Sequence, residues 1–133
     1  MCLDLKIGHI AVELNSEEDA DRFFEELLGL KKISSKVVSA DLIESFFGVN
    51  RDQKLLRYGN NDLDFEVFIT GNTEKSQDIF THTCIFIENR DKFVKRVRLL
   101  GFKDIKVPRQ EGNGYYLFVQ DSFENLYEIK ESA

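Results

Sequence analysis

An internal repeat constrains the fold of this chain more than any other feature. The segment "LLGLKKI" begins at residue 27 and the similar "LLGFKDI" begins at residue 99, 72 positions later. Each segment ends a stretch in which apolar residues have helical spacing, and each such stretch follows an apolar, strand-like segment. The two strand-like segments contain the only two histidines of the chain, His9 and His82. The 133 residues therefore predict two copies of one folding unit within a single domain, 1–133.

The two predicted helices carry matching signals at their ends. Ser16 and Asn89 are good N-caps, and Gly29 and Gly101 stand where a helix C-cap is expected. The residues predicted to line the buried faces are Ala20, Phe23, Phe24, Leu27 and Leu28 in the first helix, and Phe93, Val97 and Leu100 in the second. Both helices are therefore expected to pack one face on a sheet.

The strand-like segments give each copy the same order of elements. They cover 7–14, 31–39, 53–59 and 63–70 in the first copy, and 80–87, 103–108, 114–120 and 125–131 in the second. The unit is strand–helix–strand–strand–strand, with a first module over about 1–71 and a second over about 78–133. The first copy is longer because of an insert over 40–50, for which a short helix and a bulged strand both stay open.

Strand alternation places both histidines on the side of the sheet away from the helices. Side chains alternate between the two faces of a strand. The β-branched and aromatic positions are expected to pack on the helices, which leaves His9, His82, Glu66 and Glu128 on the opposite face. That face also carries apolar residues, so it is predicted to line a pocket: Ala11, Phe68, Cys84, Phe86 and Leu126.

Two histidines and two glutamates at equivalent places in the repeat predict a metal site. Burying two carboxylates without a counter-ion is costly, whereas a divalent cation neutralises them and neutral imidazoles complete its shell. The alternative is that each histidine is a hydrogen-bonded core residue and that each glutamate lies on a solvated face.

Composition excludes several other classes of function. The net charge of −6, with both signs mixed along the chain, argues against a nucleic-acid or anionic-membrane surface. No apolar run approaches the roughly 20 residues of a membrane-spanning helix, and we expect no signal peptide. Cys2 and Cys84 are interpreted as free thiols in a reducing cytoplasm, with Cys84 a small packing residue.

The whole pattern resembles the vicinal oxygen chelate superfamily, which includes glyoxalase I, methylmalonyl-CoA epimerase, extradiol dioxygenases and fosfomycin-resistance proteins. The matching segments are "IGHIAVEL", "FFEELLGLKK", "LDFEVFI", "FTHTCIFIEN", "LLGFKD" and "YYLFVQDSFENLYEI". The resemblance implies an α+β fold in which two βαβββ modules form a cupped mixed sheet, with the helices on its convex face. It implies metal ligands at His9, Glu66, His82 and Glu128.

This ligand set is most similar to that of bacterial-type glyoxalase I, and the epimerases use a closely related one. The resemblance implies a metal-dependent isomerase or lyase that moves a proton through a metal-stabilised enediolate, with Glu128 or Glu66 as the base. The cofactor would be a divalent ion (nickel, cobalt, zinc or manganese), the partner a small-molecule substrate, and the assembly a homodimer in the cytoplasm. Two departures from the glyoxalase I pattern, described next, favour the epimerase side of this class.

Two departures separate the chain from glyoxalase I. Glu13 stands where that family commonly has an arginine that helps to hold glutathione, which puts glutathione in doubt. The loop "DSFEN", 121–125, replaces the usual Asp-Pro-Asp-Gly-Asn. Two other functions stay open. One is an extradiol-type dioxygenase, which uses three ligands rather than four. The other is a metal-free drug-binding protein of the bleomycin-resistance type, which needs no ligand set.

The remaining aromatic and basic residues are assigned to structure first. The aromatic set is interpreted as mostly core, with a few members walling a substrate: Phe46, Phe47, Phe68, Phe86, Tyr115, Tyr116 and Phe118. The basic set is interpreted as solvated strand surface, with binding of a phosphate or carboxylate as the alternative: Lys54, Arg57, Lys106 and Arg109.

Overall fold

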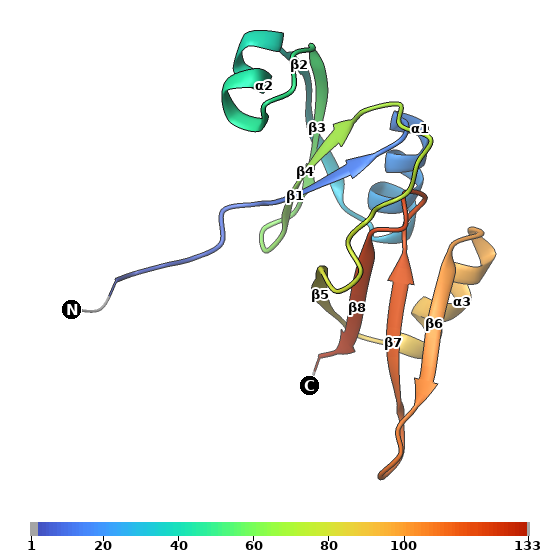
Figure 1. Ribbon diagram of the computed structural model, residues 1–133. Helices are drawn as coiled ribbons and strands as arrows, with labels where there is room; N and C mark the ends of the chain where they lie inside the picture. The colour runs from blue at the N-terminus through green and yellow to red at the C-terminus, as the bar shows by residue number, and fades with distance from the viewer. Residues whose placement is uncertain (1–2, 133) are drawn as a thin grey trace. The chain divides into compact units, whose positions relative to one another are not determined.

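The computed structural model describes residues 3–132, and the chain divides into two compact units, Met1–Asn72 and Thr73–Ala133. Cys2 lies outside the described residues. Unit 1 contains β1 (Ile10–Leu14), α1 (Glu17–Ala20), η1 (Asp21–Leu27), β2 (Lys31–Val38), α2 (Ala40–Phe47), β3 (Gln53–Gly59) and β4 (Asp64–Ile69) (Figure 1). Its sheet has the order β1-β4-β3-β2, with β1 parallel to β4 and the other neighbours antiparallel.

Unit 2 repeats this arrangement without the α2 insert. It contains β5 (His82–Ile87), α3 (Arg90–Leu99), β6 (Lys103–Pro108), β7 (Tyr115–Gln120) and β8 (Leu126–Glu131). Its sheet has the order β5-β8-β7-β6, again with the first and last strands parallel. The predicted α+β fold with two βαβββ modules is therefore confirmed, as two four-stranded mixed sheets. Within residues 3–132, no helix has the length and apolar character needed to span a bilayer.

The predicted helix ends are confirmed. The backbone N–H groups of Asp19 and Lys92 donate to the side chains of Ser16 and Asn89, at 3.2 and 3.0 Å. Gly29 and Gly101 adopt left-handed φ angles of 73° and 84°, which favour glycine over other residues. The first helix differs from the expectation in its winding, because its second part, η1, is a π-helix.

The core of unit 1 lies between the first helix and one face of its sheet. The ring of Phe24 is 5.1 Å from the rings of Phe23, Tyr58 and Phe65, and all four residues are fully buried. Tyr58 donates its hydroxyl hydrogen to Asp21 at 2.7 Å, which satisfies the one polar group in this cluster.

In unit 2 the helix is rotated relative to the sequence prediction. Val94 and Val97 are the buried residues of α3, whereas Phe93 and Leu100 are only half-buried. Phe93 instead lines an open groove with Ile87 and Leu99. The sheet residues Ile85, Val119, Tyr127 and Ile129 are buried beneath α3, as the strand alternation predicted for β5 and β8.

The insert forms a helix, α2, and it covers the other face of the unit 1 sheet. The Phe47 ring of α2 packs edge-on against Phe68 of β4, with centroids 5.4 Å apart. Phe68 has the same strand parity as Glu66, opposite to the buried Phe65 and Val67. The repeated helices therefore lie on one face of the sheet as expected, and the insert, which the sequence left open, forms a helix on the other face.

The prediction that the aromatic set is mostly core is also wrong. Phe46, Phe47, Phe86 and Tyr116 are exposed, and Phe68, Tyr115 and Phe118 are half-buried. Phe68, Phe86, Tyr116 and Phe118 have the strand parity opposite to the buried residues of their strands, and Phe46 and Phe47 lie on α2. Tyr115 shares the parity of the buried Leu117 and Val119 but is the first residue of β7. Cys84 is likewise an exposed free thiol rather than a packing residue.

Replacing Phe24 with alanine tests this account of the core. The change removes a fully buried ring with three aromatic neighbours, so we expect a loss of about 3–5 kcal/mol in the free energy of unfolding. Phe46→Ala is the matched control, because that ring is 66% exposed and its loss should cost less than about 1 kcal/mol. Urea unfolding measures both, and equal losses would contradict the assignment.

Candidate metal centre

The two predicted ligands of unit 1 lie together on the face of the sheet opposite the first helix. His9 directly precedes β1, and Glu66 is in the middle of β4, the parallel neighbour of β1. The Nε2 atom of His9 is 3.2 Å from Oε1 of Glu66. The histidine side chain is 48% exposed and the glutamate 22%, so the pair is accessible to a small ligand.

Unit 2 repeats the same pair. His82 is the first residue of β5, and Glu128 is in the middle of β8. The Nε2 atom of His82 is also 3.2 Å from Oε1 of Glu128. The histidine lies opposite Leu126 in the register and reaches diagonally to Glu128, two residues along the strand. The two units therefore repeat the same side-chain pair, in which a histidine at the start of the first strand lies against a glutamate of the last strand.

The His82 ring has a defined hydrogen at Nδ1. This atom lies 2.8 Å from the backbone oxygen of Phe80, and a carbonyl oxygen only accepts hydrogen bonds, so Nδ1 donates. In the neutral ring Nε2 then carries a lone pair, and it faces a carboxylate oxygen of Glu128. Two acceptors at 3.2 Å are bridged either by a shared hydrogen or by a metal ion.

Both pairs fit the ligand chemistry of a borderline divalent ion. Imidazole nitrogen and carboxylate oxygen are the donors that zinc, nickel, cobalt and manganese accept. Donors that bind one ion at about 2.0–2.2 Å, in octahedral or tetrahedral positions, lie roughly 2.9–3.5 Å from each other. The observed 3.2 Å in each pair falls inside this range. A backbone carbonyl on the second ring nitrogen, as Phe80 provides for His82, is a typical support for a metal-binding histidine.

The four predicted ligands are brought together as two pairs, one in each unit. Within residues 3–132, no group of three or more histidine, cysteine, aspartate and glutamate side chains is placed to hold a metal ion. The convergence of all four ligands on one ion therefore stays a prediction.

The surroundings of the two pairs differ in polarity. In unit 1, Glu66 lies beside Arg57 in the register, and Arg57 forms an ion pair with Asp64 on the same face. The hydrogen bond to Asp64, with the charge of Glu66 as a smaller cause, raises the pKa of the Arg57 guanidinium. In unit 2 the place of Arg57 is taken by Phe118, whose ring meets the His82 ring edge-on with centroids 5.5 Å apart.

The basic residues interpreted as solvated surface all make contacts. Lys54 forms an ion pair with Glu17, and Arg57 with Asp64. The Lys106 ammonium and the Arg109 guanidinium lie 4.2 and 4.4 Å from the ring centroids of Tyr115 and Tyr116. Alternation alone did not show which carboxylate or ring each cation would meet.

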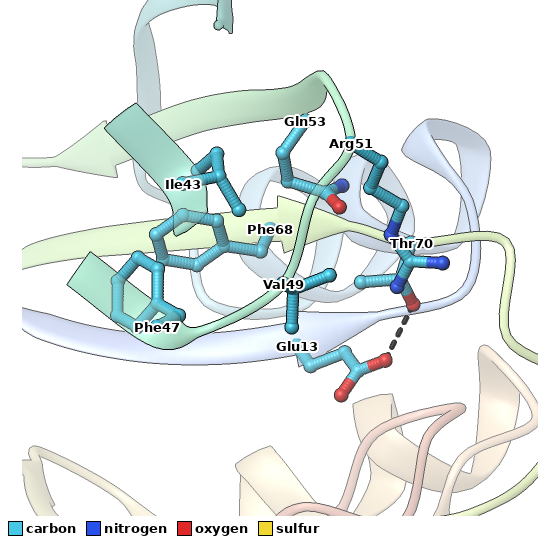
Figure 2. Close-up of a pocket in the computed structure, with 8 residues that line it drawn as sticks. All are labelled: Glu13, Ile43, Phe47, Val49, Arg51, Gln53, Phe68 and Thr70. Carbon is cyan, nitrogen blue, oxygen red and sulfur yellow. Dashed lines mark hydrogen bonds between the residues drawn. The ribbon is translucent and has the colours of Figure 1, made fainter. Parts of the chain in front are cut away.

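Glu13 is held by hydrogen bonds and lines a pocket (Figure 2). Its Oε2 accepts from the Thr70 hydroxyl at 2.5 Å and from the Asn72 side-chain amide at 3.5 Å. The Glu13 side chain is half-buried. The expected conflict between this carboxylate and a glutathione carboxylate stays a prediction.

Asp121 is a buried acid that the sequence prediction treated only as part of a turn. Its carboxylate accepts from the backbone N–H groups of Phe123 and Asn125, from the Asn125 amide, and from the Tyr127 hydroxyl, at 2.8–3.0 Å. Burial raises the pKa of the Asp121 carboxyl to about 6, although these donors oppose the shift. The network fixes the loop 121–125 that leads into β8, the strand that carries Glu128.

Comparison with known proteins gives one family and many structural neighbours. The sequence model of the Glyoxalase/Bleomycin resistance protein/Dioxygenase superfamily matches residues 6–129. A search of curated proteins gives no match. The solved structures that resemble the chain include a glyoxalase family protein from Bacillus cereus, with a TM-score of 0.73 and 15% identity over 98% of this chain and 95% of that one.

Two further neighbours are fosfomycin resistance proteins. FosX from Mesorhizobium loti has a TM-score of 0.69 and 14% identity, over 98% of this chain and 94% of that one. A mutant of FosX from Listeria monocytogenes, complexed with Mn(II) and 1S,2S-dihydroxypropylphosphonic acid, has a TM-score of 0.70 and 16% identity, over 96% and 90%. At these identities the likeness concerns the fold.

Asp121 gives a prediction about stability and pH. Its folded pKa of about 6 lies above the ordinary 3.8, so the folded state binds a proton more tightly than the unfolded state does. The stability contributed by this group is fully present below about pH 4 and is lost as the pH rises through about 6. The loss approaches about 3 kcal/mol for a shift of this size.

Asp121→Asn should abolish this pH-dependent contribution to the free energy of unfolding. As the pH rises from 4 to 7, the unfolding free energy of the native chain should fall relative to that of the variant. Urea unfolding at several pH values measures it. The exposed Asp62→Asn serves as the control. A difference that stays constant over this range would show that the folded and unfolded states bind the Asp121 proton equally, and would contradict the prediction.

Proposed function

Because the chain belongs to the Glyoxalase/Bleomycin resistance protein/Dioxygenase superfamily, we propose that it is a divalent-metal-dependent enzyme for a small molecule. The reaction is proton transfer at a carbon next to a carbonyl, of the glyoxalase I or acyl-CoA epimerase type. The observation that carries the proposal is the repeated pair of His Nε2 and Glu Oε1 at 3.2 Å, His9 with Glu66 and His82 with Glu128.

The four side chains have a defined division of tasks in this proposal. His9, Glu66, His82 and Glu128 hold the ion, either within one chain or across a homodimer. When bound, a divalent ion supplies Lewis-acid stabilisation of negative charge on the substrate oxygens. The two glutamates offset the charge of the ion, and the Phe80 carbonyl fixes the His82 ring so that Nε2 faces the ligand position.

One of the two glutamates would transfer the proton that leaves the substrate carbon. Each uses Oε1 against its histidine, and neither has a hydrogen-bond partner for Oε2 within residues 3–132. That free oxygen can accept a proton from a neighbouring carbon and return it. Glu66 has Arg57 beside it in the register, whereas Glu128 lies next to Phe118 and Cys84. We take Glu128 as the base, because its register neighbours offer no charged group that would compete with the substrate for its free oxygen.

The fosfomycin resistance neighbours support a second candidate function. One is complexed with Mn(II) and a dihydroxypropylphosphonic acid. The corresponding reaction in this chain would be the addition of water to the epoxide of fosfomycin, with a glutamate removing a proton from the water. The same ligand pairs would hold the ion, so substrate turnover alone separates the two candidates.

Metal content is the first test. We expect one divalent ion per chain by mass spectrometry of protein purified without a histidine tag. Each of His9→Ala, Glu66→Gln, His82→Ala and Glu128→Gln should weaken binding at least tenfold, because every ligand serves the same ion. The exposed Glu111→Gln is the control and should bind normally.

The stoichiometry also reports how the two pairs are used. Two ions per chain, with one lost in each variant, would mean that each pair is a separate site and would overturn the shared site. No uptake of nickel, cobalt, zinc or manganese would overturn the catalytic proposal and favour a metal-free binding protein.

Proton transfer itself can be followed by NMR in D₂O. The metal-loaded protein should exchange or transfer the carbon-bound proton of methylglyoxal–thiol adducts or of acyl-CoA epimers. Glu128→Gln should lower this rate by about 10²–10⁴-fold at saturating metal, as for loss of a general base. Conversion of fosfomycin to its diol without any exchange would instead support the second candidate.

A further inference from the structure

The pocket of unit 1 lies on the same face of the sheet as the His9–Glu66 pair. Two of its lining residues, Glu13 of β1 and Phe68 of β4, are register partners. Phe68 follows Glu66 by two positions, so it points to the same side, and its Cα lies roughly 7 Å further along the strand. The pocket therefore begins one side-chain row from the candidate metal ligands.

The insert of the first module builds the outer wall of this pocket. Ile43 and Phe47 come from α2, and Val49 and Arg51 come from the segment that follows it, as Figure 2 shows. Gly48 ends α2 with a left-handed φ of 76°, which turns the chain so that Val49 faces the cavity. Unit 2 has no equivalent of α2, so only one copy of the repeat has this wall.

The lining favours an uncharged carbon group. Ile43, Phe47, Val49 and Phe68 present apolar surface around about 220 Å³ of space. A cavity of about 150 Å³ lined by such residues is enough to bind benzene. The polar Gln53 is already engaged, because its side-chain amide donates to the Ile69 carbonyl. Glu13 is held by Thr70 and Asn72, and its negative charge opposes an anionic tail.

The exposed parts of the lining point to the same occupant. Phe47 is 60% exposed and Val49 is 40% exposed, although both border the cavity. A ligand group seated between them and Phe68 would remove this apolar surface from water, which is the favourable term for binding. Arg51 is an exposed residue of the lining, and its guanidinium can meet an anionic group elsewhere on the ligand.

We propose that this pocket binds a compact, uncharged alkyl or aryl group of the substrate and sets its specificity. The proposal rests on the proposed function, since the reacting oxygens of the same molecule would lie at the metal ligands. The substrate class is then a small compound with two adjacent oxygens at one end and a branched or aromatic carbon group at the other. In this assignment, α2 is the element that determines specificity.

Two probes that differ only in their tail test the proposal. Pyruvate and 4-methyl-2-oxopentanoate both present two adjacent oxygens, and only the second carries a branched tail. Titrations of the metal-loaded protein, followed by calorimetry and by amide chemical shifts, should show the branched acid binding at least tenfold tighter. Its tail should shift the resonances of residues 43–53 and 68–70, and pyruvate should not.

A filled pocket should remove this preference. Val49→Trp places a larger side chain in the cavity and should bring the two affinities to within about threefold, with pyruvate unaffected. Leu42→Trp is the matched control, because Leu42 is on α2, is 49% exposed and is not part of the lining. It should keep the preference.

The outcomes separate this proposal from the proposed function. Metal uptake with equal affinity for both acids, or a preference that survives Val49→Trp, would overturn the pocket assignment and leave the metal site standing. Absence of metal uptake would overturn the proposed function. Shifts at the pocket from the branched acid alone would then still support the pocket, and their absence would overturn it.

Discussion

The parallel pairing of the first and last strands of each unit is the constraint on which the rest depends. β1 pairs with β4 and β5 with β8, and parallel neighbours require a crossover, which carries the repeated helix over one face of the sheet. That face becomes core, so the polar side chains of the same strands are directed to the other. A histidine at the start of one strand then meets a glutamate in the middle of its neighbour. The His–Glu pair is thus a consequence of topology combined with strand alternation.

Much of this was predictable because it depends on periods of two and 3.6 residues. The repeat and the approximate strand boundaries follow from such patterns. So does the direction of Glu66 and Glu128, which point to the face of the sheet away from the repeated helices. The predictions failed where packing chooses between adjacent residues of similar character. Val94 rather than Phe93 is buried, although both positions are apolar and adjacent in the sequence. The insert was ambiguous because four apolar residues in eight fit both a helix and a strand.

In the candidate site too, sequence patterns predicted which face each residue lies on, and only the structure shows the contacts it makes. Alternation predicted the faces of His9 and His82, and the structure adds the distances within each pair. The interaction that fixes the His82 ring comes from a backbone carbonyl, which has no signal in the sequence. The Asp121 network was also missed. An acid at a turn before a strand looks like ordinary turn chemistry until its burial and its four donors are known.

The two copies of the repeat keep the ligand pair and differ in the row beside it. That row is Glu13 and Phe68 in unit 1, and Phe86 and Lys130 in unit 2, each a register pair. One copy therefore has an acid and the other a base, and only the first has a helix over it. Metal ligands tolerate little change because their donors must match the ion, whereas neighbouring residues are free to fit a substrate. An asymmetric substrate requires such a difference between copies, since two identical surroundings would bind its two ends equally. In the proposed function, the symmetric part of the repeat holds the ion, and the asymmetric part, with α2, selects the substrate.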